Sequence, residues 1–245
     1  MFFPGLIIND KMAKKIIAIV PAHNEARHIG PLVESLCKIR NKRNGIIHEV
    51  LVVDDGSTDN TAKIAKSKGA SVIRLKRNSG KAFAVYKGAQ EAAKRNATII
   101  VTSDADIMPV TEAQIDALIR PIGRGSYDMS IGTVFGDDPT VSGQRAIRIR
   151  ALMPLLRPTK EKNWEPEFGI RNGKLAERLG YGLEDALNEK LRKNITLKTT
   201  TFNTARRMYG KTSAHIQFQE MKLAHYPKNA EKKRMPKARR RRGKG

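Results

Sequence analysis

Residues 98–106 read Thr-Ile-Ile-Val-Thr-Ser-Asp-Ala-Asp, and this stretch decides the fold class of the 245-residue chain. Its β-branched first half predicts a buried strand, which ends abruptly at two carboxylates one residue apart. A similar event occurs earlier, where Glu49-Val-Leu-Val-Val53 runs into Asp54-Asp55-Gly56-Ser57-Thr58-Asp59. Because parallel strands present their carboxyl ends at one edge of a sheet, we expect both acidic segments to lie at that edge.

Each acidic segment also has a purely structural interpretation. Asp55 or Ser57 would serve as a helix cap, and Asp104 to Asp106 would form a solvated turn before Pro109. Helix caps and acidic turns are far commoner than metal sites, so neither segment alone indicates a function. Two such segments at one predicted sheet edge favour oxygen ligands for a hard divalent cation.

The first half of the chain alternates predicted strands with predicted helices. Apolar runs lie at 16–20, 50–53, 71–75 and 98–102, and stretches of helical period lie at about 27–40, 59–68 and 80–95. This alternation predicts an α/β fold with a parallel sheet and right-handed crossovers. Beyond Pro109 we expect a helix at about 111–120, a strand at about 128–135, a loop at 136–143 and helices at 144–156 and 173–193.

The composition fits one sizeable domain. The chain has a mass of 27.3 kDa, and 40% of its residues are hydrophobic. Its single cysteine, Cys37, excludes an intrachain disulfide and a cysteine-based metal site, and it fits a reducing cytoplasm. The apolar N-terminus has no basic segment before it, and nowhere do eighteen apolar residues run together. We therefore expect a cytoplasmic protein without a membrane-spanning helix.

The net charge of +23 predicts an anionic partner. Residues 232–245 hold nine basic residues and no acidic one, and subtracting them leaves +14 for residues 1–231. Such a tail is typical of a disordered cationic arm. It would hold the protein at the inner face of an anionic membrane as a peripheral protein, or it would bind nucleic acid without sequence preference.

Four motifs resemble the inverting GT-A glycosyltransferases of family 2. They are Ile19-Val-Pro-Ala-His-Asn-Glu25, Val52-Val-Asp-Asp-Gly-Ser-Thr-Asp59, Asn78-Ser-Gly-Lys81 and Thr102-Ser-Asp-Ala-Asp106, in the family's order and at its spacing. A fifth segment, Gly180-Tyr-Gly-Leu-Glu-Asp-Ala-Leu-Asn188, looks like the family's region for the catalytic base. The resemblance implies a GT-A fold, a Rossmann-like and mostly parallel sheet flanked by helices, with a smaller C-terminal acceptor-side region.

The same resemblance suggests how the chain is divided. We expect an N-terminal extension at 1–14 and a nucleotide-sugar-binding GT-A core at 15–135. Residues 136–231 would form the acceptor-side and catalytic-base region of the same domain, and 232–245 the basic tail. The implied activity is a metal-dependent, inverting transfer of one sugar from a UDP- or GDP-linked donor to an acceptor hydroxyl or phosphate. A lipid-linked acceptor is among the candidates.

Such a transfer requires a site for the nucleoside, positive charge for the leaving diphosphate and a base for the acceptor hydroxyl. By resemblance, the nucleoside lies against the segment after the first strand, which contains Pro21, Ala22, Asn24 and Glu25. Glu25 would accept hydrogen bonds from the ribose hydroxyls. Asp54 or Asp55 would accept one from a uracil or guanine N–H.

The diphosphate has candidates of its own. Lys81, at the start of a predicted helix, would meet a phosphate with its ammonium and the nearby free backbone N–H groups. Asp104 and Asp106 would hold Mg²⁺ or Mn²⁺, because alternation along a strand end points both carboxylates to one side with Ala105 between them. Asp104 and Ala105 complete the predicted nucleotide-sugar site.

The fifth segment offers two candidate bases, Asp185 first and Glu184 second. Adjacent acids on a helix point about 100° apart, so at most one of them is expected to face the acceptor. Both acids would also fit solvated positions in the first turn of a helix.

Two other classes of protein remain as alternatives. A nucleic-acid-binding protein on a nucleotide-binding fold would explain the charge, but it has no use for Asp104 and Asp106. A sugar nucleotidylyltransferase would normally carry a glycine-rich basic loop after its first strand, where this chain reads Pro21-Ala-His-Asn-Glu25. The sequence leaves the donor sugar, the nucleotide base, the acceptor and the oligomeric state undetermined.

Overall fold

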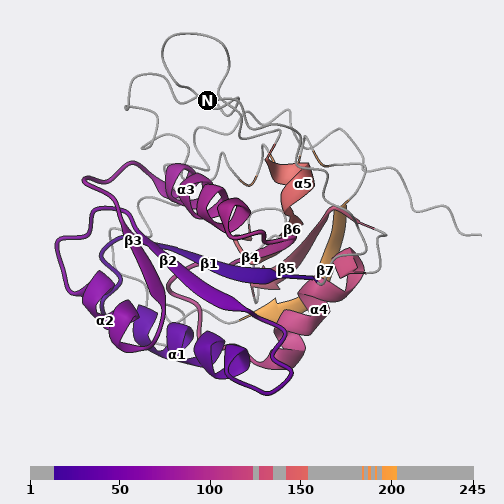
Figure 1. The fold of residues 1–245 in the computed structure, drawn as a ribbon, viewed down its shortest axis with the longest axis horizontal. Helices are drawn as coiled ribbons and strands as arrows, with labels where there is room; N and C mark the ends of the chain where they lie inside the picture. The colour runs from indigo at the N-terminus through magenta and orange to yellow at the C-terminus, as the bar shows by residue number, and fades with distance from the viewer. Residues whose placement is uncertain are drawn as a thin grey trace, which may run out of the picture. The chain divides into compact units, whose positions relative to one another are not determined.

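A single sheet organises the part of the chain that this computed structural model describes, which comprises residues 14–123, 127–134, 142–153, 184, 187, 188, 191 and 195–202. Its seven strands lie in the order β3-β2-β1-β4-β6-β5-β7 (Figure 1). The strands are β1 Ile16–Ala22, β2 Glu49–Asp54, β3 Ser71–Arg74, β4 Ile99–Thr102, β5 Met129–Val134, β6 Arg145–Arg148 and β7 Ile195–Phe202. The helices are α1 Ile29–Arg40, α2 Thr61–Ser67, α3 Lys81–Lys94, α4 Glu112–Gly123 and α5 Ile149–Leu152.

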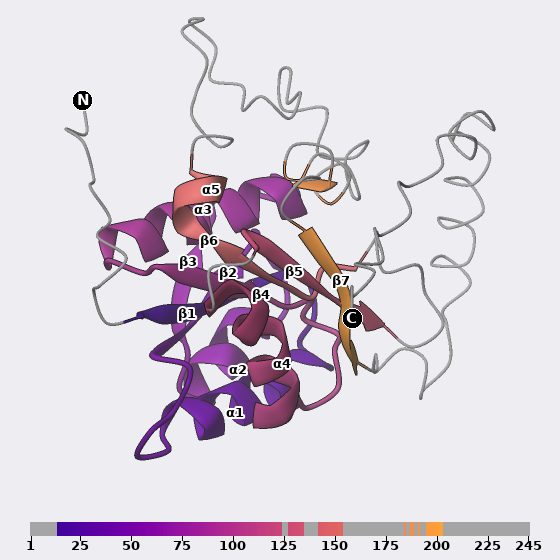
Figure 2. The same cartoon turned by 90° about the vertical axis from the view of Figure 1, so that its right-hand side faces the viewer.

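Most strand pairs in this sheet are parallel. β1 pairs with β2 and with β4, β2 pairs with β3, and β5 pairs with β7, all in parallel. Only β6 is antiparallel to its neighbours, β4 and β5. The α/β class, the mostly parallel sheet and the first five predicted strands are therefore confirmed. Figure 2 shows β7 as the edge strand beside β5.

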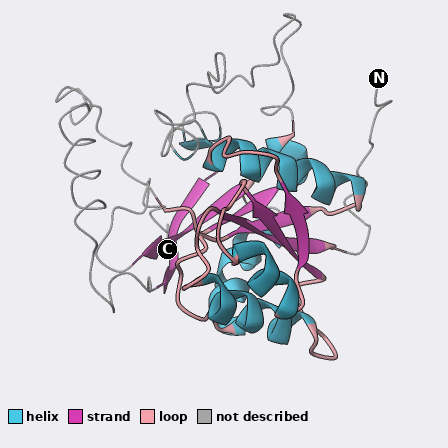
Figure 3. Cartoon of the chain, turned by 90° about the vertical axis from the view of Figure 1, so that its left-hand side faces the viewer, coloured by secondary structure: helices cyan, strands magenta, loops and turns pink. Residues whose placement is uncertain are grey.

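Helices cover both faces of the sheet. Helices α1, α2 and α4 lie on one face, and α3 and α5 lie on the other (Figures 1 and 3). Successive side chains of a strand point to opposite faces, so Ala18 and Val20 of β1 join the core under α1, whereas Ile17 and Ile19 join the core under α3. Burial on both faces explains why the central strands are continuous apolar runs.

The predicted helix at 144–156 is wrong in its first part. Residues Arg145–Arg148 form β6, with all four residues buried, and among the described residues of this stretch Ile149–Leu152 is helical. The segment inserts between β4 and β5, where Ile147 lies opposite Ile100 and Met129. Pairing within the sheet therefore overrides a local pattern that is ambiguous between helix and strand. Strand β7, Ile195–Phe202, was also not predicted from the sequence.

Several predictions fall partly outside the described residues. Of the predicted helix at 173–193, the structure describes Glu184, Leu187, Asn188 and Leu191, which are all helical. The chain divides into two compact units, Met1–Ala205 and Arg206–Gly245, and every described residue belongs to the first. The basic tail and the predicted boundaries of the N-terminal extension and the acceptor-side region thus stay predictions. Among the described residues, no helix has the length and apolar character needed to cross a membrane.

Candidate functional site

The carboxyl ends of β1, β2 and β4 meet at one edge of the sheet. Ala22 at the end of β1 lies opposite Asp54 at the end of β2, and Thr102 at the end of β4 lies opposite Ile19. The chain moves outward from β1 to β2 and β3 on one side, and β4 lies on the other side. In open α/β sheets this change of direction creates the crevice in which ligands bind. The predicted meeting of the two acidic segments at one edge is confirmed.

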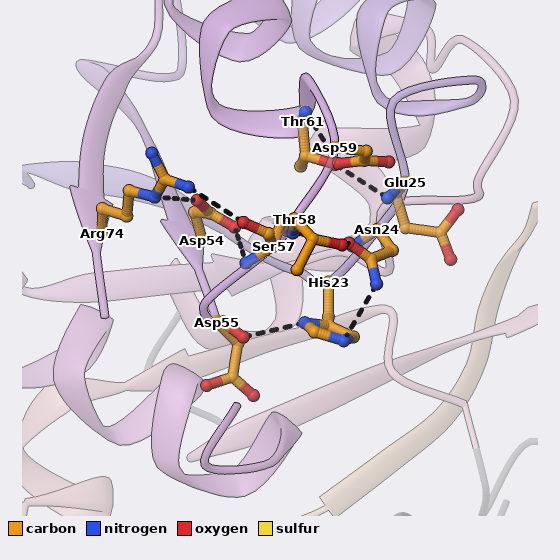
Figure 4. Close-up of polar contacts among 10 residues, drawn as sticks. All are labelled: His23, Asn24, Glu25, Asp54, Asp55, Ser57, Thr58, Asp59, Thr61 and Arg74. Carbon is orange, nitrogen blue, oxygen red and sulfur yellow. Dashed lines mark hydrogen bonds and ion pairs between the residues drawn. The ribbon is translucent and has the colours of Figure 1, made fainter. Parts of the chain in front are cut away.

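Hydrogen bonds tie the loop after β1 to the loop after β2 (Figure 4). The Asn24 backbone N–H donates to Ser57 Oγ at 3.0 Å, and Asn24 Oδ1 accepts from the Thr58 N–H at 2.9 Å. The Glu25 N–H donates to Thr61 Oγ1 at 2.8 Å. Asn24 has a positive φ of 54°, a conformation that asparagine tolerates better than most residues. These contacts fix the segment that we predict to cradle a nucleoside, and the contact with a nucleoside stays a prediction.

Asp54 and Asp55 both stabilise backbone at this edge. Asp54 is fully buried, and its Oδ1 accepts from the Ser57 N–H at 3.0 Å. Arg74 Nε lies 3.2 Å from Asp54 Oδ2, which makes an ion pair without hydrogen-bond geometry. Asp55 accepts from the backbone N–H groups of Ser79 and Gly80 at 2.8 and 2.7 Å. Burial raises the pKa of Asp55, although these two N–H donors oppose the rise.

Lys81 lies between two carboxylates at the start of α3. Its Nζ is 2.6 Å from Asp104 Oδ1 and 2.6 Å from Glu184 Oε1. Burial alone would lower the pKa of the Lys81 ammonium, but the two carboxylates outweigh burial and raise it above its ordinary value. Lys81 is therefore charged and connects the end of β4 with the helical residues around Glu184. Its predicted contact with a phosphate stays a prediction.

Strand β4 ends at Thr102, and Ala105 and Asp106 form a turn, so the extended strand end expected for the Asp104-Ala105-Asp106 segment is not what the structure has. Ser103 and Ala105 are buried, whereas Asp104 and Asp106 are partly exposed. This pattern fits a cation site, because Mg²⁺ in proteins is commonly held by one or two carboxylates together with substrate phosphates. Among the described residues, no group of three or more His, Cys, Asp or Glu side chains is placed to hold a metal. The predicted cation site at Asp104 and Asp106 stays a prediction.

A pocket lies between the end of β4, the start of α3 and the helical residues around Glu184. It is lined by Pro21, Lys81, Val85, Thr102, Asp104, Gly143, Arg145, Glu184 and Leu187. Of the predicted residues, it brings together Pro21, Lys81, Asp104 and Glu184. The predicted residues that do not line it are Ala22, Asn24, Glu25, Asp54, Asp55, Ala105 and Asp106. Asp185 lies outside the described residues, so its predicted role as the base stays a prediction.

The segment from Ser142 to Arg145 belongs to the site and was missed in the sequence. Arg145 is buried, with 1% of its surface exposed. Its Nε donates to the Ser142 carbonyl at 2.7 Å, and its Nη1 donates to Asn188 Oδ1 at 2.8 Å. Arg145 thereby connects β6 to the helical residues that include Glu184. The available signal was the pair of arginines on either side of Ala146-Ile147 in Arg145–Arg148, because an arginine that is buried needs specific partners.

Gly56 is expected to be irreplaceable at this edge of the sheet. It has a φ of 68°, and a Cβ atom there would lie 2.4 Å from the Arg77 carbonyl carbon. Gly56→Ala should therefore lower the free energy of unfolding by roughly 2 kcal/mol, measured by urea denaturation. Gly30→Ala is the matched control, since a Cβ atom there would meet a methyl group of Ile64 at 3.3 Å and alanine suits a helix. Equal stability of the two variants would contradict this account of Gly56.

Comparison with known proteins identifies the family. Residues 17–181 match the model of glycosyl transferase family 2, and this match covers most of the chain. The chain therefore belongs to glycosyltransferase family 2. An uncharacterized protein of Methanocaldococcus jannaschii is 35% identical over 126 residues, which are 51% of this chain and 49% of that protein. The 4,4'-diaponeurosporenoate glycosyltransferase of Staphylococcus aureus is 32% identical over 112 residues, 44% of this chain and 28% of the enzyme.

The chain thus spans half or less of the length of these curated relatives. Similar solved structures include the glucosyl-3-phosphoglycerate synthase of Mycobacterium tuberculosis in complex with Mn²⁺ and UDP-glucose. Its TM-score is 0.62 at 18% identity, and the match covers 88% of this chain and 78% of the enzyme. The same enzyme with Mg²⁺ and UDP gives a TM-score of 0.57 at 19% identity, over 80% of this chain and 72% of the enzyme. The likeness confirms the predicted GT-A fold.

Proposed function

We propose that this protein is a metal-dependent, inverting glycosyltransferase that moves one sugar from a nucleotide-diphosphate donor to an acceptor in a single displacement. The pocket that joins Lys81, Asp104 and Glu184 carries the proposal. In this proposal Asp104 would serve as a cation ligand, Lys81 as a fixed positive charge and Glu184 as a carboxylate base, next to one another at the switch point of the sheet. The family and the UDP complexes of the similar solved structures support a nucleotide-sugar donor.

Asp104 and Asp106 would hold Mg²⁺ or Mn²⁺ at the end of β4. When bound, the cation would neutralise charge that develops on the leaving diphosphate. Lys81 contacts Asp104 directly and brings a second positive charge to the same place. A cation and a lysine on one side of the pocket would favour departure of the diphosphate, because both stabilise charge that grows in the transition state.

Glu184 is the base that we propose from the described residues. It lines the same pocket as Asp104, and only 1% of its surface is exposed. Its Oε1 contacts Lys81, whereas its buried Oε2 accepts no hydrogen bond from the described residues. A buried carboxylate oxygen without a donor is suited to take the proton of an acceptor hydroxyl. Asp185, the first choice from the sequence, is the alternative that mutagenesis must compare.

The nucleoside would lie against the two loops that follow β1 and β2. Hydrogen bonds within the protein hold these loops together, and Asp55 ties them to the start of α3 through Ser79 and Gly80. Such preorganisation lowers the entropic cost of binding. Groups around the pocket would fix the donor sugar. A binding measurement is needed to choose between a uridine and a guanosine donor.

A donor panel tests this function. The melting temperature of the protein should rise by about 5 °C or more with one UDP- or GDP-linked sugar at saturating concentration, because a ligand that binds only the folded state stabilises it by mass action. The rise should require Mn²⁺ or Mg²⁺. Release of pyrophosphate from a nucleoside triphosphate and a sugar phosphate would favour the nucleotidylyltransferase, because that reaction forms a nucleotide sugar and pyrophosphate. Stabilisation by oligonucleotides alone would favour the nucleic-acid-binding protein.

We also propose that the acceptor is lipid-linked and that the tail at 232–245 holds the enzyme at an anionic membrane. Its nine basic residues would each contribute about 1 kcal/mol near such a surface. Deletion of residues 232–245 should reduce co-sedimentation with vesicles that contain phosphatidylserine. It should leave metal-dependent donor hydrolysis unchanged, since the described site lies within residues 14–202. Vesicle binding that persists in full after the deletion would contradict the proposal.

A further inference from the structure

The carboxylate of Asp104 is held from two sides. Lys81 approaches Oδ1 at 2.6 Å, and the Gln144 side-chain amide donates from Nε2 to Oδ2 at 3.3 Å. Each carboxylate oxygen has two lone-pair sites, so one contact per oxygen leaves each oxygen able to bind a cation as well. Gln144 precedes β6 and comes from a segment that is distant from Asp104 in the sequence.

The backbone around Gln144 is shaped to admit Asp104. A Cβ atom at Gly143 would lie 2.4 Å from Asp104 Oδ1 and 2.6 Å from Oδ2, so only glycine lets the carboxylate approach this closely. Thr102 Oγ1 donates to the Gly143 carbonyl at 2.8 Å, which fixes the segment against the end of β4. The carboxylate therefore lies in a built recess and not on an open strand end.

The other end of the Gln144 amide lacks a protein partner in the part of the chain that the structure describes. Only 1% of the residue is exposed, and its Oε1 is buried and accepts no hydrogen bond from the described residues. A buried acceptor without a donor costs about 1–3 kcal/mol. An amide that donates to a ligand carboxylate and has a free acceptor oxygen is suited to receive a hydrogen bond from water on a bound cation.

We propose that Gln144 is a positioning residue for Asp104, which it orients for the divalent cation. This inference rests on the proposed function, because it takes Asp104 as a cation ligand. The amide hydrogen bond restricts rotation of the carboxylate, and the recess at Gly143 sets its distance from the backbone. Partners that orient metal ligands in this way typically change metal affinity by about 10–100-fold when they are removed.

Direct binding of Mn²⁺ to the full chain tests the proposal. The electron paramagnetic resonance signal of free Mn²⁺ gives the dissociation constant of Mn²⁺ from the protein. The measurement is made with UDP or GDP present, whichever of the two stabilises the protein, and it does not require the protein to be active. Gln144→Leu and the nearly isosteric Gln144→Met both remove the amide, and the second keeps the packing if the first fails to fold. We expect both to weaken Mn²⁺ binding by about 10-fold or more.

Ser130→Ala is the matched control, because Ser130 is a buried polar residue of the same sheet that donates to the Leu118 carbonyl. It should leave Mn²⁺ binding unchanged even if it lowers stability. Binding by Gln144→Met within about twofold of wild type, while Asp104→Asn abolishes binding, would overturn the role of Gln144 but leave the proposed function intact. Equal binding by wild type and Asp104→Asn would overturn both.

Discussion

Asp106→Asn is expected to reduce sugar transfer by on the order of 10²-fold or more while the protein stays folded. The substitution removes a charged cation ligand, and metal stabilisation of transition-state charge contributes several kcal/mol. Asp106 is partly exposed and follows the end of β4, so its loss opens no cavity in the core. The measurement is the rate of nucleoside diphosphate release at saturating donor and Mn²⁺, together with the melting temperature.

Asp116→Asn controls for the loss of one negative charge. Asp116 lies on α4 and makes an exposed ion pair with Arg120, so its replacement should leave the rate unchanged. A rate in Asp106→Asn above about a tenth of wild type, with Mn²⁺ in excess, would show that the charge of Asp106 has no part in stabilising the transition state.

Glu184→Gln should also lower the rate by on the order of 10²-fold or more, with donor affinity changed by less than about threefold. A general base acts on the acceptor in the transition state and contributes little to binding of the nucleotide. The amide keeps the shape of the carboxylate but cannot accept the proton. Single-turnover kinetics and equilibrium binding of the donor separate the two effects.

Asp185→Asn is the matched comparison, because it removes the neighbouring carboxylate. We expect a loss of less than about threefold if Glu184 is the base, since adjacent residues of a helix point about 100° apart. A large loss in Asp185→Asn with none in Glu184→Gln would move the role to Asp185. If Glu184→Gln instead weakened donor binding as much as it lowered the rate, Glu184 would act through Lys81, which it contacts at 2.6 Å.

Much of the sheet edge that carries the site could be predicted, because short stretches of sequence specify it. A β-branched run that ends at a pair of carboxylates specifies a buried strand, and β4 ends at Thr102 just before them. Two helix ends also carry a local signal, because Gly69 lies just after α2 and Gly80 just before α3, with φ of 93° and 92°. Regular alternation of strands and helices then determines the parallel order of β1 to β4.

The rest of the site depends on contacts between distant segments. Nothing in the local pattern of Arg145–Arg148 shows that it inserts between β4 and β5, so its strand conformation was missed. The roles of Gln144 and Gly143 depend on their distance from Asp104, which arises only once β6 pairs with β4. Likewise, Lys81 was predicted from its place at a helix start, but its contact with Glu184 spans 103 positions of the sequence.

The most direct test of the whole account is the coupling between the cation and the donor. Isothermal titration should measure the affinity of the preferred nucleotide sugar with and without Mn²⁺, in the wild type and in the Asp104→Asn, Asp106→Asn double variant. Coupling between two ligands is a reciprocal free energy, so a cation held by Asp104 and Asp106 that also stabilises the bound diphosphate would tighten donor binding. The account predicts a tightening of about 10-fold or more in the wild type and none in the double variant. The same affinity in all four measurements would contradict it.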